Sequence, residues 1–167
     1  FFDNVTVWQA ISNLPKPTED GNISTKKPEN DYQKFLSSNS GRTYNHIMTK
    51  HNSVAVRRME KVGINENFTV LDEKIKTVHS GSYGRLDPDN IAPTITTRFD
   101  TPSGGRFIHP FENRTITPRE AARIQSFPDD FEFIGTKSSI CKQIGNAVPP
   151  KLSYFLGTMI RRILEND

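Results

Sequence analysis

The feature that most constrains how this chain folds is an apolar stripe near its C-terminus. Proline fits the first turn of a helix, so Pro149 and Pro150 mark a helix start. The large apolar residues that follow recur at helical spacing: Leu152, Phe155, Leu156, Met159, Ile160, Ile163 and Leu164. We expect an amphipathic helix of roughly 20 Å, at 1.5 Å per residue. Its stripe needs a partner surface, which the rest of the chain does not obviously supply.

Composition excludes several classes of protein. Of the 167 residues, 34% are hydrophobic, which predicts a modest core or a chain that depends on a partner. No run of about 18 apolar residues is present, so we expect no membrane span. The first residues lack a basic stretch followed by an apolar one, and we expect no signal peptide. A single cysteine excludes a disulfide scaffold and a zinc site built from cysteines, and we expect no metal site.

Positive charge is concentrated in residues 41–62. Arg42, Lys50, Arg57, Arg58 and Lys61 stand there against Glu60 alone. This excess suits a polyanion such as DNA, and it equally suits a solvated helix face. The net charge of +3 is too small to choose between them.

Composition divides the chain into residues 1–40, 41–115 and 116–167, and the pattern predicts an α+β fold. We expect short helices near residues 7–14 and 51–62. The alternation in Thr94-Ile95-Thr96 predicts a strand over residues 91–98, and residues 106–108 are a candidate for the next strand. Thr117, Pro118 and Glu120 form a capping box that starts a helix, which must end near Phe127 because Pro128 follows.

Two stretches are too specific to arise from composition. They are Thr117-Pro118-Arg119-Glu120-Ala121-Ala122-Arg123-Ile124-Gln125-Ser126-Phe127-Pro128-Asp129 and Gln143-Ile144-Gly145-Asn146-Ala147-Val148-Pro149-Pro150. In this order they resemble the last two motifs of the cytosine-C5 DNA methyltransferases. Upstream, Gly84-Arg85-Leu86-Asp87 and Ala92-Pro93-Thr94-Ile95-Thr96-Thr97 resemble the end of that family's target-recognition domain.

Other motifs of that family are absent from the sequence. The chain contains no Gly-x-Gly cofactor loop, no Pro-Cys nucleophile loop and no Glu-Asn-Val triplet. The resemblance therefore implies the C-terminal part of a methyltransferase, as a separate subunit or as a piece of a longer protein. Residues 1–40 would lead in from the catalytic domain, and residues 41–115 would form a small recognition domain of short strands and loops. The helices of residues 116–167 would return to a Rossmann-like catalytic domain.

The resemblance implies methyl transfer from S-adenosylmethionine to carbon 5 of cytosine in double-stranded DNA. Catalysis needs a flipped base and a cysteine thiolate. Cys141 follows Ile140 rather than a proline, and a lone cysteine among apolar neighbours is usually a small buried hydrophobe. We therefore expect no catalytic residue in this chain and no activity from the chain alone.

The resemblance also implies roles for particular residues. Thr94, Ile95 and Thr96 would contact the DNA backbone, although Thr and Ile are also ordinary strand formers. Arg85, Arg98 and Arg106 would read guanine or hold phosphate, or they are surface charges. Asn146, with Ala147, would lie at the edge of the S-adenosylmethionine pocket, or Asn146 merely shapes a helix end. Arg119, Glu120 and Gln143 would be structural.

These expectations also imply partners. The last helix would pack on a catalytic N-terminal half, or its stripe would be covered by self-association. The whole would be a DNA (cytosine-5-)-methyltransferase of a restriction-modification system, in the bacterial cytoplasm near the nucleoid. The alternative is a non-catalytic DNA-binding module derived from such an enzyme.

Overall fold

The computed structural model describes residues 4–37, 41–77 and 79–165. Within these ranges the chain is mostly helical, with one small antiparallel sheet in which β1 (Ile23–Ser24) pairs with β2 (Arg42–Thr43). The helices are α1 (Val7–Ile11), α2 (Asp31–Leu36), α3 (Ser53–Lys61), α4 (Pro118–Ile124), α5 (Lys137–Asn146) and α6 (Pro150–Leu164). Residues 38–40, which close the predicted leading segment, lie outside the described residues.

The helices expected from capping and periodicity are present. α1, α3, α4 and α6 form where they were predicted, whereas α2 and α5 were not foreseen. The capping box of α4 is confirmed: the Glu120 amide donates to Thr117 Oγ1 at 3.1 Å, and the Thr117 amide donates to Glu120 Oε2 at 2.7 Å. α4 ends at Ile124 because Ser126 adopts a φ of 67°, which reverses the chain before Pro128.

The predicted strands over residues 91–98 and 106–108 were wrong. Residues 91–96 run without regular secondary structure, and Ile108 makes only isolated bridges to Arg85 and Thr115. A ladder needs a neighbouring strand with free backbone groups. The 91–96 segment instead lies against helices, and Pro93 has no N–H to donate. In the part of the chain that the structure describes, the paired strands are β1 and β2, which the sequence pattern did not predict.

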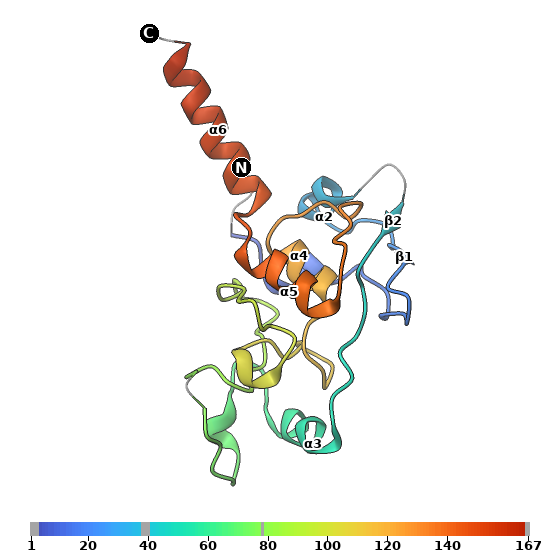
Figure 1. Ribbon diagram of the computed structural model, residues 1–167, viewed down its shortest axis with the longest axis vertical. Helices are drawn as coiled ribbons and strands as arrows, with labels where there is room; N and C mark the ends of the chain where they lie inside the picture. Colours follow the sequence, from blue (N-terminus) through green and yellow to red (C-terminus); the bar gives the residue numbers. More distant parts are fainter. Residues whose placement is uncertain (1–3, 38–40, 78, 166–167) are drawn as a thin grey trace.

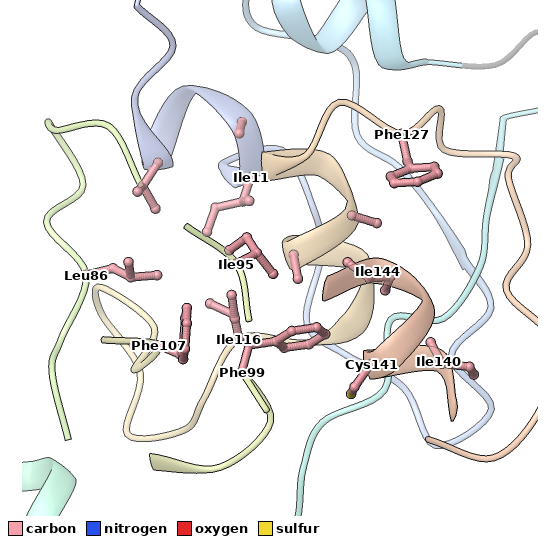
Figure 2. Close-up of a cluster of buried hydrophobic side chains, with 14 of the residues drawn as sticks. Ile11, Leu86, Ile95, Phe99, Phe107, Ile116, Phe127, Ile140, Cys141 and Ile144 are labelled. Atoms are coloured by element: carbon pink, nitrogen blue, oxygen red, sulfur yellow. The ribbon is translucent and has the colours of Figure 1, made fainter. Parts of the chain in front are cut away.

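One hydrophobic cluster draws on all three sequence regions (Figure 2). Ile11 comes from α1, Ile95 and Phe99 come from the middle region, and Ile116 and Ile144 come from the C-terminal region. A smaller cluster of Met59, Tyr83 and Ile108 lies beside α3, with Ile75 packed against it. The middle region is therefore attached to the helices by shared burial and not only by the chain.

Three buried arginines tie α4 to the rest of the chain. Arg123 makes a bidentate pair with Asp129, with both N–O distances 2.7 Å, and it also donates to the carbonyl of Ala10. The Arg119 guanidinium donates to three carbonyls: Tyr44 O at 2.7 Å, Pro128 O at 2.8 Å and Phe131 O at 2.5 Å. Burial lowers the pKa of Arg119 to about 10, so the group is still charged at neutral pH. A buried charge is tolerated only when it is paired in this way.

The third arginine, Arg114, pairs with Glu120. Arg114 Nη1 and Nη2 donate to the two carboxylate oxygens at 2.8 and 2.7 Å. Burial alone would raise the pKa of Glu120, but the hydrogen bonds and charge of Arg114 outweigh it and lower the pKa from 4.5 to about 2. The ion pair of Glu120 is thus made with Arg114, while its neighbour Arg119 bonds to carbonyls.

The C-terminal helix extends away from the body (Figure 1). None of the residues of α6, Pro150–Leu164, is buried. All seven residues of the stripe remain exposed: Leu152, Phe155, Leu156, Met159, Ile160, Ile163 and Leu164. Within the described residues, no helix has both the length and the apolar character needed to cross a membrane.

We predict that Glu120→Gln lowers the free energy of unfolding by about 3 kcal/mol, because it removes the buried carboxylate from Arg114 and leaves only the more exposed Glu112 as an ion-pair partner. In the parent chain, stability from this carboxylate is complete above pH 4.5 and is lost as the pH falls from 4.5 toward 2, since folding depresses the Glu120 pKa. Urea unfolding at pH 7 and at decreasing pH measures both effects. The exposed Glu60→Gln should change stability by less than about 0.5 kcal/mol, and an equal loss in both variants would contradict the prediction.

Candidate nucleic-acid interface

The segment Thr94–Thr97 sits directly on the end of α5. A Cβ added to Gly145 would lie 2.6 Å from the carbonyl carbon and oxygen of Thr96 and 2.6 Å from the amide nitrogen of Thr97. Real side chains do not approach a backbone so closely, so this contact requires glycine. The predicted DNA-contacting segment and the predicted cofactor motif thus meet backbone to backbone.

Within this segment, alternate side chains face opposite ways. Ile95 is buried in the main hydrophobic cluster, where Figure 2 labels it near Ile11 and Ile116. Thr94 and Thr96 are exposed, and both line an open groove of about 650 Å³. The burial of Ile95 therefore anchors the segment while the two threonine hydroxyls face solvent.

This first groove also has Arg106 in its wall, with the Gly104–Gly105 turn beside it. Arg106 Nη1 donates to the carbonyls of Glu66 at 3.0 Å and Arg85 at 3.3 Å, which fixes the side chain. Neutral polar groups and small residues supply most of the remaining lining: Asn67, His79, Ser80, Gly81, Pro93 and Phe107. The side chains of this lining can donate hydrogen bonds to an anion without an opposing carboxylate.

Arg98 lies on a second groove, of about 690 Å³, next to the first. Its side chain is 64% exposed, and its Nε is 3.5 Å from Asp100 Oδ1. Sequence reasoning did not single out the other basic residues there, Lys74 and Lys76. The available signal was a Lys-x-Lys pair around Ile75, which is a weak pattern without knowledge of what it faces.

Arg85 does not share this surface. The side chain is buried, and all five of its N–H groups are used inside the chain. Their acceptors are the carbonyls of Val62, Met59, His109 and Glu112 and the side chain of Asn113, at 2.6–3.0 Å. A guanidinium engaged in this way has no donor left for a base, so its geometry favours a structural role.

The predicted cofactor residues lie at the C-terminal end of α5. Asn146 is the last residue of the helix and is exposed, and Ala147 caps the helix, with its amide 3.3 Å from the carbonyl of Ile144. Gln143 donates to the Ile134 carbonyl at 2.9 Å. One side-chain amide and nearby main chain suit the edge of an S-adenosylmethionine site, but they do not form an enclosing pocket.

Cys141 lies inside the main cluster (Figure 2). Burial, followed by the charge of Asp100, raises the pKa of its thiol to about 12. A protonated, inaccessible thiol is a poor nucleophile. The described residues also contain no group of three or more His, Cys, Asp or Glu that could hold a metal ion.

Comparison with known proteins shows which family this chain is similar to. A model of the C-5 cytosine-specific DNA methylase family matches residues 4–162. The chain is 34% identical to DNA (cytosine-5)-methyltransferase 4 of Arabidopsis thaliana, covering 98% of this chain and 13% of that protein. It is 31% identical to the type II methyltransferase M.DdeI of Desulfomicrobium norvegicum, covering 95% of this chain and 43% of the relative.

Two further matches differ in length. The type II methyltransferase M.AquIB of a Picosynechococcus species is 43% identical over 65% of this chain, and that alignment covers 81% of the relative. A crystal structure of a protein described as a DNA modification methyltransferase, encoded within a prophage of E. coli, superposes with a TM-score of 0.74 at 25% identity. It covers 99% of this chain and 49% of that protein. The chain thus spans less than half the length of the plant protein, M.DdeI and the prophage protein. Its alignment with M.AquIB covers most of that relative.

We predict that Gly145→Ala destabilises the chain by about 1–3 kcal/mol, because the new methyl group displaces the Thr96–Thr97 peptide. Chemical denaturation measures the loss, and amide chemical shifts of Thr94–Thr97 report the displacement. Gly157→Ala is the matched control, since a Cβ at Gly157 meets nothing within 4 Å. In that helix interior alanine should be the more stable residue by roughly 0.5–1 kcal/mol. Unchanged Thr94–Thr97 shifts in Gly145→Ala would refute the proposed contact.

Proposed function

Because the chain belongs to the C-5 cytosine-specific DNA methylase family, we propose that it is the part of such an enzyme that recognises DNA and completes the cofactor pocket. The full enzyme transfers methyl from S-adenosylmethionine to cytosine in duplex DNA. The similarity to two type II methyltransferases supports a place in a restriction-modification system.

The observation that carries this proposal is the contact between Gly145 and the Thr96–Thr97 peptide. It joins the Thr94–Thr97 segment, which lines a groove, to α5, which ends at Asn146. Methyl transfer requires the flipped base and the methyl donor to be held in line with their reacting atoms about 3–3.5 Å apart before the reaction. A rigid backbone contact between a DNA-facing segment and a cofactor-facing helix end is what that requirement calls for.

We assign contact with the DNA backbone to Thr94 and Thr96, whose hydroxyls can donate to phosphate oxygens, with Ile95 as their anchor. Arg98 and Arg106 would hold phosphate or read guanine from the same surface. Arg85 would support the surface from inside, because its donors are already used. This division replaces the three equivalent arginines that the sequence alone offered.

Asn146 and Ala147 would form one edge of the S-adenosylmethionine site. The cofactor supplies the activated methyl group. The Asn146 side-chain amide, exposed at the helix end, can donate to the carboxylate of the cofactor. The remaining walls of the site, and the Pro-Cys nucleophile that this chain lacks, would come from a catalytic N-terminal half.

That half would be either part of the same protein or a separate subunit. The longer relatives favour the first arrangement, since the chain covers only 13–43% of the plant protein and M.DdeI. M.AquIB supports the second arrangement, because its alignment with this chain covers 81% of the length of M.AquIB. In both cases the exposed stripe of α6 would be buried against the catalytic half.

A non-catalytic DNA-binding module is the alternative. It is compatible with the grooves, which need no catalytic partner to contact DNA. It leaves the exposed stripe of α6 unexplained, because a self-sufficient binding module has no reason to expose seven large apolar residues. The two functions differ in whether a catalytic half restores methyl transfer.

We expect the purified chain to transfer no methyl group, and a mixture with its catalytic half to methylate duplex DNA. Incorporation of labelled methyl from S-adenosylmethionine into DNA is the measurement. Cys141→Ala should retain the activity of the assembled enzyme, because the buried, protonated thiol takes no part in chemistry. Turnover by the isolated chain, or an inactive but folded Cys141→Ala enzyme, would overturn the proposal.

We also predict that Ile160→Asp weakens assembly with the catalytic half by at least tenfold, because burial of an isoleucine contributes about 1.5–3 kcal/mol. Pull-down titration of the two halves measures the effect. Thr158→Asp, on the opposite side of α6 from Ile160 by helix geometry, should assemble normally. Equal assembly of both variants would show that the stripe is covered by something else, and sedimentation of the isolated chain would then reveal self-association.

A further inference from the structure

The second groove has a wall that the proposed DNA contacts do not explain. It is lined on one side by residues 74–77 and His79 and on the other by Arg98, Thr101, Ser103 and Gly104. His79 and Gly104 line both this groove and the first one. The two grooves therefore form one continuous concave surface that leads away from Thr94 and Thr96.

The charge along this surface has one sign. Lys74, Lys76 and Arg98 line the second groove, and Arg106 lines the first. Among the described residues, neither lining includes an aspartate or a glutamate. A concave surface with several cations and no lining carboxylate attracts a polyanion more strongly than the net charge of the chain indicates.

Two acidic side chains near the second groove each lie beside an arginine, and Asp100 Oδ1 is 3.5 Å from Arg98 Nε. Glu73, which precedes Lys74, accepts from Arg58 Nε at 3.0 Å and from Arg58 Nη2 at 2.7 Å. These hydrogen bonds lower the pKa of the Glu73 carboxyl, so it is ionised and its charge is compensated by Arg58. Lys74 and Lys76 therefore keep their positive charge available to a ligand.

The side of the second groove that carries Lys74 and Lys76 is held in place by packing. Ile75 packs against the cluster of Met59, Tyr83 and Ile108, while its neighbours Lys74 and Lys76 are exposed. Two hydrogen bonds connect the chain just after His79 to the opposite wall: the Tyr83 amide donates to the Pro102 carbonyl at 2.6 Å, and the Ser82 hydroxyl donates to the Ser103 carbonyl at 2.9 Å. The groove is thus shaped before any ligand binds, which reduces the entropy cost of binding.

We propose that this second groove binds the phosphodiester backbone of the duplex next to the part held at Thr94 and Thr96, with Lys74 and Lys76 as phosphate contacts. This inference rests on the proposed function. A lysine presents a point charge without the planar fork that matches a guanine edge. The two lysines accordingly contribute affinity and register on the DNA, and sequence is read elsewhere.

The test is the salt dependence of DNA binding by the complete methyltransferase that contains this chain. Fluorescence anisotropy with labelled duplexes, with and without the methylation site, gives the slope of log K against log salt. Each phosphate contact contributes about 0.9 to that slope. K74Q/K76Q should reduce its magnitude by about 1.8 and weaken binding to both duplexes by the same factor. The KM for DNA should rise while kcat is unchanged.

The matched control is K26Q/K27Q, which removes the same charge from exposed lysines that follow β1, away from the green segment of Figure 1 that carries the groove. It should retain the parental slope. A parental slope in K74Q/K76Q, or the same reduction in both variants, would refute the proposal that Lys74 and Lys76 contact phosphates. Failure of the parent enzyme to bind any duplex would instead refute the proposed function, and with it this inference.

Discussion

The buried charges around α4 are the interaction on which the rest of the structure depends. Arg119 and Arg123, four residues apart on this short helix, donate to the carbonyls and carboxylate of other segments, while Glu120 accepts hydrogen bonds from Arg114. A helix of seven residues has little stability of its own. Because an unpaired buried charge costs several kcal/mol, each of these contacts fixes where its partner segment must lie. α4 therefore sets the positions of α1, β2 and the chain after Pro128.

The contacts of α4 also determine where the candidate nucleic-acid interface lies. Gln125, just after α4, donates to the carbonyl of Ile144, and this contact holds α5 against the core. α5 in turn brings Gly145 against the Thr96–Thr97 peptide. The Thr94–Thr97 segment, which we propose faces DNA, thus has its position set by two helices and by the burial of Ile95. A surface loop without these constraints would not hold a phosphate contact in constant relation to a cofactor.

The molecule has two unlike faces. The grooves beside Thr94 and Arg98 are polar and basic, and water solvates them well in the free chain. The stripe of α6 is apolar and extends away from the body in Figure 1. Burial of the stripe is driven by the hydrophobic effect and is nearly independent of salt, whereas binding in the grooves weakens as salt rises. Under the proposed function, the chain would therefore remain attached to its catalytic half while it exchanges DNA.

Local signals in the sequence determined the helices that carry their own start and periodicity. The capping box at Thr117 and the apolar spacing after Pro150 fix α4 and α6 without reference to the rest of the chain, and the ordered motifs indicate the family. The tertiary structure alone decided which polar residues face outward. Arg85 and Arg98 are equivalent in sequence, but five acceptors from separate segments surround the first and solvent surrounds most of the second. Similarly, Thr94-Ile95-Thr96 alternates like a strand, but no strand was positioned to pair with it. Strand pairing and burial depend on contacts between residues far apart in the chain, whereas the periodicity of a sequence reflects only residues close together in it.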